Sequence, residues 1–279
     1  MRDTAVALTA AGIDNARFEA RLLLGHATGL SIEQLIARGP DPAPSGIEST
    51  LRTLTARRVQ REPVAYILGE REFWGLPFKV TPAVLVPRPD SETVIEAVLA
   101  LKPDRRRAWR LLDLGVGSGC LLLTLLREYP QATGVGLDAS PGALAVAGEN
   151  AAALGVADRT SLVAGDWRLP GWLEAVGGPF DLVVANPPYV ESGAIDGLMP
   201  EVARFEPRLA LDGGADGLDA YRAIAAAGPK LITSGGLLIV EVGEGQAVEI
   251  SSILDRSGLR PAGRWRDLGG VERVLAVEQ

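Results

Sequence analysis

An apolar run leads directly into a glycine-rich loop at Leu111-Leu112-Asp113-Leu114-Gly115-Val116-Gly117-Ser118-Gly119. The run predicts a buried strand, and the glycines predict a tight turn that lets a ligand approach the backbone before a helix begins. The spacing is G-x-G-x-G, which differs from the dinucleotide pattern G-x-G-x-x-G. An acidic residue, Asp138, ends the next apolar run 19 positions after Gly119, where a carboxylate accepts hydrogen bonds from ribose hydroxyls. These features together predict a pocket for a ribose-containing ligand.

Strand and helix patterns alternate from about residue 109 onward. Short apolar, β-branched runs predict strands at residues 109–114, 133–137, 161–164, 180–185, 236–242, near Arg264 and at 271–277. Helical patterns lie between them, at residues 120–128, 141–154 and 218–233. Alternation of this kind predicts βαβ units with right-handed crossovers, hence an α/β domain with a Rossmann-like parallel sheet.

The first 70 residues have a different, helical character. Asp14 or Asn15 and the capping-box pair Ser31 and Gln34 are typical of helix starts, and a further helix is expected from residue 47 to about 61 after a loop at 41–46. Residues 73–80 predict a β-hairpin with its turn at 75–77, followed by a helix at 93–101. We therefore expect a helical recognition or support domain at 1–70, a hairpin linker at 71–92 and the α/β domain at 93–279.

A stiff loop, Asn186-Pro187-Pro188-Tyr189, follows the apolar run at residues 180–185. The two prolines lack N–H groups and fix φ, so the backbone leaves the sheet in a predetermined shape. Open α/β sheets place their chemistry at such loops, at the carboxyl ends of the strands. An amide side chain, carbonyls without a competing local N–H and an aromatic ring suit a planar NH2 group, such as an amide or an amino-substituted base.

Other residues carry weaker signals. Asp166 follows the third strand and is a candidate acceptor for an adenine amino group, while Trp167 is a candidate to pack on the adenine face or to close the core. We expect Cys120 to pack at the start of its helix and His26 to have a structural or surface role. Residues 212–217 do not match EF-hand spacing and are expected to form a plain acidic turn.

Composition narrows the function classes. One cysteine and one histidine exclude an internal disulfide and argue against a metal centre, and no apolar stretch is long enough to span a bilayer, so we expect a cytosolic protein. Residues 1–80 carry ten Lys or Arg and nine Asp or Glu, a net charge of +1. Because the whole chain has a net charge of −7, residues 81–279 carry −8. An acidic catalytic part is a poor match for an enzyme acting on duplex nucleic acid, and the basic run at 105–107 is interpreted as a solvated linker.

The glycine loop, Asp138 and the Asn186–Tyr189 loop together resemble class I S-adenosylmethionine-dependent methyltransferases. The match extends over nearly the whole chain and is similar to the HemK/PrmC family, the peptide chain release factor glutamine methyltransferases. The resemblance rests on four motifs: Arg71-Glu72-Phe73-Trp74-Gly75-Leu76, Val86-Pro87-Arg88-Pro89-Asp90-Ser91-Glu92, Asn186-Pro187-Pro188-Tyr189 and Phe205-Glu206-Pro207.

The resemblance implies a site and a reaction. The implied residues for the cofactor S-adenosyl-L-methionine are Gly115, Val116, Gly117, Ser118, Gly119, Asp138, Trp167 and Asn186. Asn186, Pro187, Pro188 and Tyr189 are implied to bind the glutamine of the release factor's Gly-Gly-Gln motif. The Asn186 oxygen and the Pro187 carbonyl would accept both amide hydrogens, and Tyr189 would pack on the amide plane, so Asn186, Pro187 and Tyr189 are the implied catalytic residues. Val116 and Ser118 stand where threonines are common in the family.

Three alternatives remain open at this stage. A glutamine methyltransferase of a ribosomal protein would share the fold and the Asn-Pro-Pro-Tyr loop. A DNA or RNA amino-methyltransferase should show a basic face or a target-recognition domain. A non-catalytic cofactor-binding module would not require Asn186. We expect class 1 release factors as partners, no membrane and no direct nucleic-acid partner, no metal, and a monomer.

Overall fold

Seven strands form one mixed sheet in the computed structural model, which describes residues 1–39 and 46–279. The loop expected at 41–46 therefore lies almost wholly outside the described residues. The sheet order is β5-β4-β3-β6-β7-β9-β8. The strands are β3 (Arg110–Leu114), β4 (Thr133–Asp138), β5 (Thr160–Ala164), β6 (Phe180–Ala185), β7 (Ile232–Glu241), β8 (Arg260–Arg266) and β9 (Glu272–Glu278). The predicted α/β class is confirmed, and each predicted strand is present within a few residues of its expected bounds.

The strand order reverses between β3 and β6. From β3 the chain proceeds outward through β4 to β5, and it then returns to add β6 and β7 on the other side of β3. A topological switch point of this kind is where open α/β sheets bind ligands. The glycine loop leaves β3 there, and Asn186 leaves β6 there, because Leu114 and Ala185 are paired in register. The sheet is not wholly parallel, since β9 inserts antiparallel between β7 and β8.

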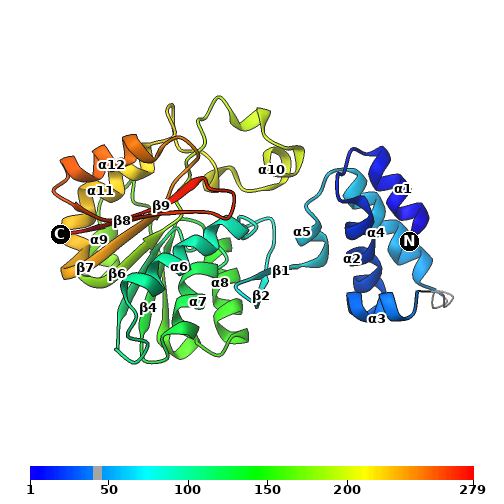
Figure 1. Cartoon of the computed structure of the whole chain (residues 1–279), viewed down its shortest axis with the longest axis horizontal. Coiled ribbons are helices and arrows are strands. Elements are labelled where there is room, and N and C mark those ends of the chain that lie inside the picture. Colours follow the sequence, from blue (N-terminus) through cyan, green and yellow to red (C-terminus); the bar gives the residue numbers. More distant parts are fainter. Residues whose placement is uncertain (40–45) are drawn as a thin grey trace. The chain divides into compact units, whose positions relative to one another are not determined.

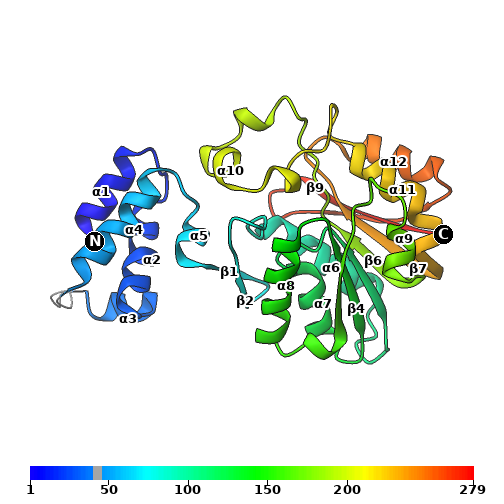
Figure 2. The same cartoon turned by 180° about the vertical axis from the view of Figure 1, so that it is seen from behind.

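Helices cover both faces of this sheet (Figures 1 and 2). Alternate strand residues such as Leu111, Leu182 and Ile239 pack with α6 (Glu92–Leu101), α7 (Cys120–Glu128) and α8 (Pro141–Ala153). Their neighbours, including Leu112 and Val183, pack on the opposite face with α9 (Trp172–Val176), α11 (Asp219–Leu231) and α12 (Ala247–Arg256). Successive side chains of a strand point to opposite faces, so each strand contributes to both cores.

The hairpin before α6 differs in detail from its prediction. Strands β1 (Glu70–Phe73) and β2 (Leu76–Lys79) are joined by Trp74 and Gly75, both at positive φ, so the turn lies one residue earlier than expected. Positive φ at both central residues is the geometry of a tight two-residue hairpin. It is unusual for a tryptophan, and two acids hold it: the Trp74 backbone N–H donates to Glu92 (2.8 Å), and its indole N–H donates to Glu128 (2.7 Å).

Contacts divide the chain into two compact units, residues 1–70 with 199–205 and residues 71–198 with 206–279. The first contains α1 (Arg2–Ala10), α2 (Ala16–Thr28), α3 (Ile32–Ala37), α4 (Ile47–Val59), α5 (Val64–Leu68) and α10 (Pro200–Phe205). The predicted capping box is present at Ser31, whose hydroxyl accepts from the Gln34 N–H and whose own N–H donates to the Gln34 side chain. Asn15 stands at the start of α2 without a side-chain cap bond.

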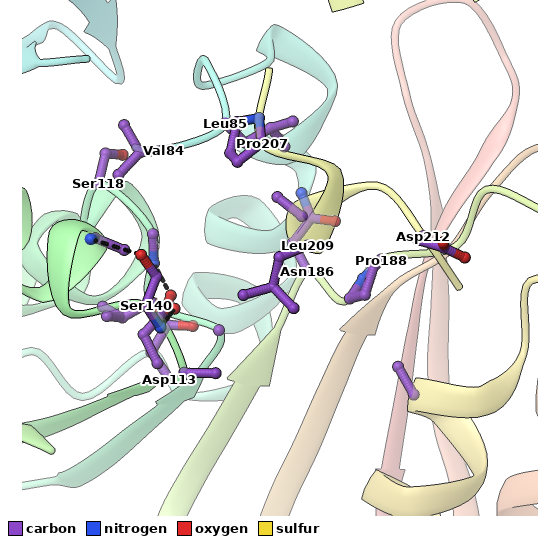
Figure 3. A pocket seen from close by; sticks show the side chains of 18 of the residues that line it. Val84, Leu85, Asp113, Ser118, Ser140, Asn186, Pro188, Pro207, Leu209 and Asp212 are labelled. Atoms are coloured by element: carbon purple, nitrogen blue, oxygen red, sulfur yellow. Dashed lines mark hydrogen bonds between the residues drawn. The ribbon is translucent and has the colours of Figure 1, made fainter. Parts of the chain in front are cut away.

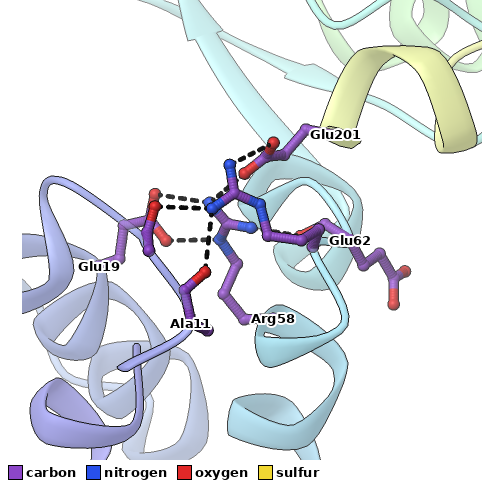
Figure 4. A network of polar contacts seen from close by, with 7 residues as sticks. Ala11, Glu19, Arg58, Glu62 and Glu201 are labelled. Carbon is purple, nitrogen blue, oxygen red and sulfur yellow. Dashed lines mark hydrogen bonds and ion pairs between the residues drawn. The ribbon is translucent and has the colours of Figure 1, made fainter. Parts of the chain in front are cut away.

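An ion-pair network within this unit joins α2, α4 and α10 (Figure 4). The buried Arg58 guanidinium donates to Glu19 (2.6 Å) and to Glu201 (2.9 Å). Arg61 donates to the other Glu201 oxygen (2.8 Å) and to the Ala11 carbonyl (3.2 Å). Because buried charges are costly when unpaired, the network ties α10 to this unit through both arginines.

Candidate active site

A pocket of about 560 Å³ opens at the switch point, within the second unit. This volume is in the range that holds a cofactor-sized molecule. Figure 3 shows one side of the pocket formed by Asp113, Ser118 and Ser140 and the other side formed by Asn186, Pro207 and Leu209. The glycine loop and the Asn-Pro-Pro-Tyr loop, about 70 residues apart in sequence, thus contribute to a single pocket.

Asp138 organises the glycine loop. One of its carboxylate oxygens accepts the Gly117 N–H (2.9 Å), and the other accepts the Ser140 N–H (2.8 Å). The N–H groups of Gly115 and Val116 both donate to the Leu137 carbonyl at 2.9 Å. Burial raises the pKa of Asp138, and these backbone donors oppose that rise. The carboxylate therefore both fixes the loop and presents its remaining lone pairs at the pocket wall.

Asp113 is a pocket residue to which the sequence interpretation gave no role. Its Oδ2 accepts the Leu122 N–H at 3.2 Å, while its Oδ1 is buried without a hydrogen-bond partner among the described residues. Burial raises the pKa of Asp113 to about 7, and nearby Asp138 adds to that rise. The sequence could have pointed to Asp113, because an acidic residue within an apolar strand seldom serves packing alone.

Trp167 lies against the glycine loop. A side-chain carbon placed on Gly115 would come within 3.2 Å of the Trp167 ring, so the two surfaces are in close contact. The neighbouring Asp166 carboxylate also lines the pocket, and it is paired with the Arg168 guanidinium at 2.6 Å. The hydrogen bond from Arg168 lowers the pKa of Asp166 and keeps it an acceptor.

The Asn-Pro-Pro-Tyr loop divides between the pocket and the core. Asn186 and Pro188 line the pocket, and the Asn186 Nδ2 donates to the Ser91 hydroxyl at 3.2 Å. Within the described residues, Gly119, Pro187 and Tyr189 lie outside the pocket lining. The Tyr189 ring packs against the core beneath α11 and α12, its carbonyl accepts from Gln246 (3.1 Å), and burial raises its pKa. Tyr189 therefore anchors the loop.

The remaining wall comes from two segments that contain no predicted site residue, the linker and the segment that follows Glu206. Val84, Leu85, Pro87 and Arg88 of the linker line the pocket, as do Pro207 to Ala210. Arg88 joins them by donating to the Glu206 carboxylate at 2.7 Å. Glu206 is 7% exposed and its Oε2 has no partner among the described residues; burial raises its pKa, and Arg88 opposes that rise.

Cys120, His26 and the acidic turn at 212–217 are the other features singled out in the sequence. Burial raises the pKa of the Cys120 thiol to about 12, so it is not an activated nucleophile. His26 is exposed on α2. The Asp212 carboxylate accepts from the Gly214 N–H (3.1 Å) and from the Ser192 hydroxyl (2.5 Å), so the acidic turn at 212–217 is bonded within itself and to Ser192, and its Asp212 and Gly214 also line the pocket. Among the described residues no group of His, Cys, Asp or Glu is arranged to hold a metal ion.

Comparison with known proteins places the chain in a family. The PrmC N-terminal domain family matches residues 1–69, and the methyltransferase small domain family matches residues 94–202. The release factor glutamine methyltransferase of Rhodospirillum rubrum is 47% identical over 272 residues, which is 98% of this chain and 82% of that protein. The release factor glutamine methyltransferase of Bradyrhizobium diazoefficiens is 44% identical over 283 residues, 100% of this chain and 93% of that protein. The chain belongs to the release factor glutamine methyltransferase family.

Family membership confirms the resemblance drawn from the sequence motifs and identifies the chain as a methyltransferase. Methyltransferases of this kind generally use S-adenosylmethionine as the methyl donor. A solved methyltransferase from Pyrococcus furiosus, 16% identical, covers 81% of this chain and 98% of its own with a TM-score of 0.53, which shows a shared fold alone. Within the residues that the structure describes, no helix has the length and apolarity to span a membrane.

Proposed function

We propose that this protein transfers a methyl group from S-adenosyl-L-methionine to the side-chain amide nitrogen of the glutamine in the Gly-Gly-Gln motif of class 1 peptide chain release factors. The observation that carries the proposal is the convergence of two loops on one pocket. The glycine loop suits a nucleoside cofactor, and Asn186, on the adjacent strand end, suits a planar amide. The family relatives support the choice of a release factor as the substrate.

The pocket residues fit the cofactor. S-adenosyl-L-methionine, when bound, supplies a methyl group activated by the positive charge on sulfur. Asp138 would accept hydrogen bonds from ribose hydroxyls, and Trp167 would pack on the adenine ring. The buried Asp113 Oδ1, which has no partner among the described residues, supplies an acceptor for an ammonium group. Asp166, Ser118, Val116, Gly115 and Gly117 complete that side of the pocket.

Methylation of an amide needs positioning, because the nitrogen lone pair is delocalised into the carbonyl. In this proposal the Asn186 Oδ1 and the Pro187 carbonyl each accept one amide hydrogen, which orients the nitrogen and favours its pyramidalisation. On taking up the methyl group the nitrogen would release one of its hydrogens as a proton to solvent, and the cofactor would be left as its demethylated thioether. Pro188 forms the wall beside them, and the anchored Tyr189 holds the loop rigid. Such positioning by fixed dipoles lowers the barrier without requiring a nucleophile from the protein.

The proposal places the reaction in the cytoplasm, with release factors as protein partners, no nucleic-acid substrate and a monomeric enzyme. The test offers labelled S-adenosyl-L-methionine with purified release factor, ribosomal proteins and DNA in parallel, and locates the modified residue by mass spectrometry. Methylation of the Gly-Gly-Gln glutamine supports the proposal. Label appearing only on a ribosomal protein or on DNA would refute it.

The role of Asn186 is tested separately. Asn186→Ala should lose most of kcat while cofactor affinity, measured by calorimetry, falls much less, because the cofactor retains its contacts with the glycine loop and Asp138. Near-normal turnover by that variant would remove Asn186 from the reaction. The calorimetric binding curve also shows that the variant is folded.

A further inference from the structure

Behind Asn186 lies a row of buried polar side chains. Strands β6 and β7 are parallel neighbours with Ala185 opposite Val240, so Asn186 and Glu241 follow at the same edge of the sheet. Ser91, in the short 3-10 helix Pro89–Ser91 of the linker, stands between them. Three segments far apart in sequence thus bring one amide, one hydroxyl and one carboxyl together.

The hydrogen bonds in this row have a direction. The Asn186 Nδ2 donates to the Ser91 oxygen at 3.2 Å. The Ser91 hydroxyl lowers the pKa of the Glu241 carboxyl, as a hydroxyl directed at a carboxylate does, and an ionised carboxylate can only accept. A serine has one hydrogen to donate, so donating it to Glu241 leaves an oxygen lone pair toward Asn186. Ser91 and Glu241 are each 2% exposed, so water does not compete for these bonds.

We propose that Ser91 and Glu241 are positioning residues that fix the orientation of the Asn186 amide, directing its NH2 group to Ser91 and leaving Oδ1 for the substrate. The inference rests on the proposed function, in which Oδ1 accepts a hydrogen of the glutamine amide. A flipped Asn186 would set Oδ1 against the Ser91 oxygen, two acceptors without a hydrogen between them. It would also present NH2 to the substrate NH2, where neither group can accept.

Glu241 acts through Ser91 and not on the substrate. It is absent from the pocket lining within the described part of the chain, whereas Ser91 and Asn186 both belong to it. Its Oε2 is buried without a hydrogen-bond partner among the described residues. A buried carboxylate with an unsatisfied oxygen costs folding energy, so its place at the end of an apolar strand is explained by the orientation that it imposes.

The surroundings of Glu241 make the row sensitive to pH. Burial raises the pKa of Glu241 to about 7, while the Ser91 bond and the cations Arg273 and Arg88 oppose that rise and Asp90 adds to it. The other titratable groups that interact with it are Tyr189, Tyr221 from α11 and Cys120 from α7. Once protonated, Glu241 can donate to Ser91, and the Ser91 hydrogen is then free to bond Oδ1 of a flipped Asn186.

The kinetic test uses Ser91→Ala, Ser91→Thr and Glu241→Gln in the full chain. Ser91→Ala should lower kcat about tenfold, the worth of one such bond, with KM for release factor and cofactor affinity little changed. Ser91→Thr keeps the hydroxyl and should recover most of that loss. Wild-type kcat should fall as pH drops below about 7, and Glu241→Gln should lose this dependence. Glu206→Gln, which removes another buried carboxyl of raised pKa, should retain it.

A spectroscopic test needs no turnover and so separates this inference from the proposed function. The side-chain NH2 resonances of Asn186, assigned from their absence in Asn186→Ala, should shift with a midpoint near pH 7 in wild type and lose that shift in Ser91→Ala and Glu241→Gln. If the Asn186 resonances change neither with pH nor with the two substitutions, the inference is overturned. It is also overturned if Ser91→Thr has as low a kcat as Ser91→Ala. If wild type fails to methylate release factor yet shows the shift, the proposed function fails and the positioning row stands.

Discussion

A methyl group added at Gly115 should weaken cofactor binding as well as the fold. Gly115 has φ of +80°, a conformation that L side chains rarely adopt, and its missing Cβ would lie 3.2 Å and 3.4 Å from two atoms of the Trp167 ring. Gly115→Ala must therefore push the indole away from the glycine loop. Gly155 offers a matched control, because it has φ of +68° and nothing within 4 Å of its Cβ.

Both substitutions force an alanine into a left-handed backbone conformation, but only Gly115→Ala also places a methyl group against the Trp167 ring. A left-handed conformation costs a non-glycine residue roughly 1–2 kcal/mol, so both variants should lose about that much free energy of unfolding. Only Gly115→Ala adds the displacement of Trp167. If the ring packs on adenine, losing an aromatic contact worth about 1.4 kcal/mol raises the dissociation constant for S-adenosyl-L-methionine about tenfold.

Calorimetric titration with S-adenosyl-L-methionine measures the affinity, and urea unfolding measures stability. We expect Gly155→Ala to bind as wild type does and Gly115→Ala to bind at least several times more weakly at similar stability. Equal affinity in both variants would refute the assignment of this wall to the adenine. A comparable loss in Gly155→Ala would show that backbone strain alone explains the effect.

Three other perturbations follow from the geometry. Asp138→Asn removes a charged acceptor of two backbone N–H groups and of the ribose, so cofactor affinity measured by calorimetry should fall roughly 10- to 100-fold. Arg58→Ala leaves two partly buried carboxylates short of a cation and should cost about 3 kcal/mol in urea unfolding. Arg57→Ala, whose side chain is 41% exposed against 5% for Arg58, should cost less than about 1 kcal/mol. Burial raises the pKa of Asp113 from 3.8 to about 7, so this group destabilises the folded state progressively as the pH rises from about 4 to about 7. The loss should be about 1.4 kcal/mol in the free energy of unfolding per pH unit across that window. Asp113→Asn should remove this loss when unfolding is measured as a function of pH.

The sequence alone predicts much of the fold because the signals for β3, α7 and β6 are local. A short apolar run, a glycine turn or a proline pair at its end, and a periodic helix all act within about ten residues. The antiparallel insertion of β9 was not predicted, since strand direction depends on pairing between distant segments. The hairpin turn at Trp74 was misplaced for a related reason: Glu92 and Glu128 stabilise a positive φ that a tryptophan would otherwise avoid.

The pocket shows the same division. Asp138 and Asn186 were found because their places at strand ends follow from the order of the chain. Ser91 appeared only within a family motif, and Glu241 not at all, because their significance depends on a contact between the linker and two strands. Asp113 is visible in the sequence as an acid within an apolar run. The run alone does not show on which face of the sheet the ligand binds, so no role could be predicted for it.

Two of the buried acids with raised pKa, Asp113 and Glu241, share a location, which bears on how stability and activity are related here. Asp113 is the last residue but one of β3 and Glu241 ends β7, and these strands lie on either side of β6, which leads to Asn186. Each has a buried carboxylate oxygen without a partner among the described residues. Apolar residues at both positions would stabilise the sheet, since removing an uncompensated buried charge is favourable. The sheet edge that carries the proposed reaction is therefore less stable than it would be with apolar residues there. Substitutions that neutralise either acid should raise the free energy of unfolding above pH 7 while lowering turnover. Opposite effects on stability and turnover would distinguish acids retained for function from acids that only complete the core.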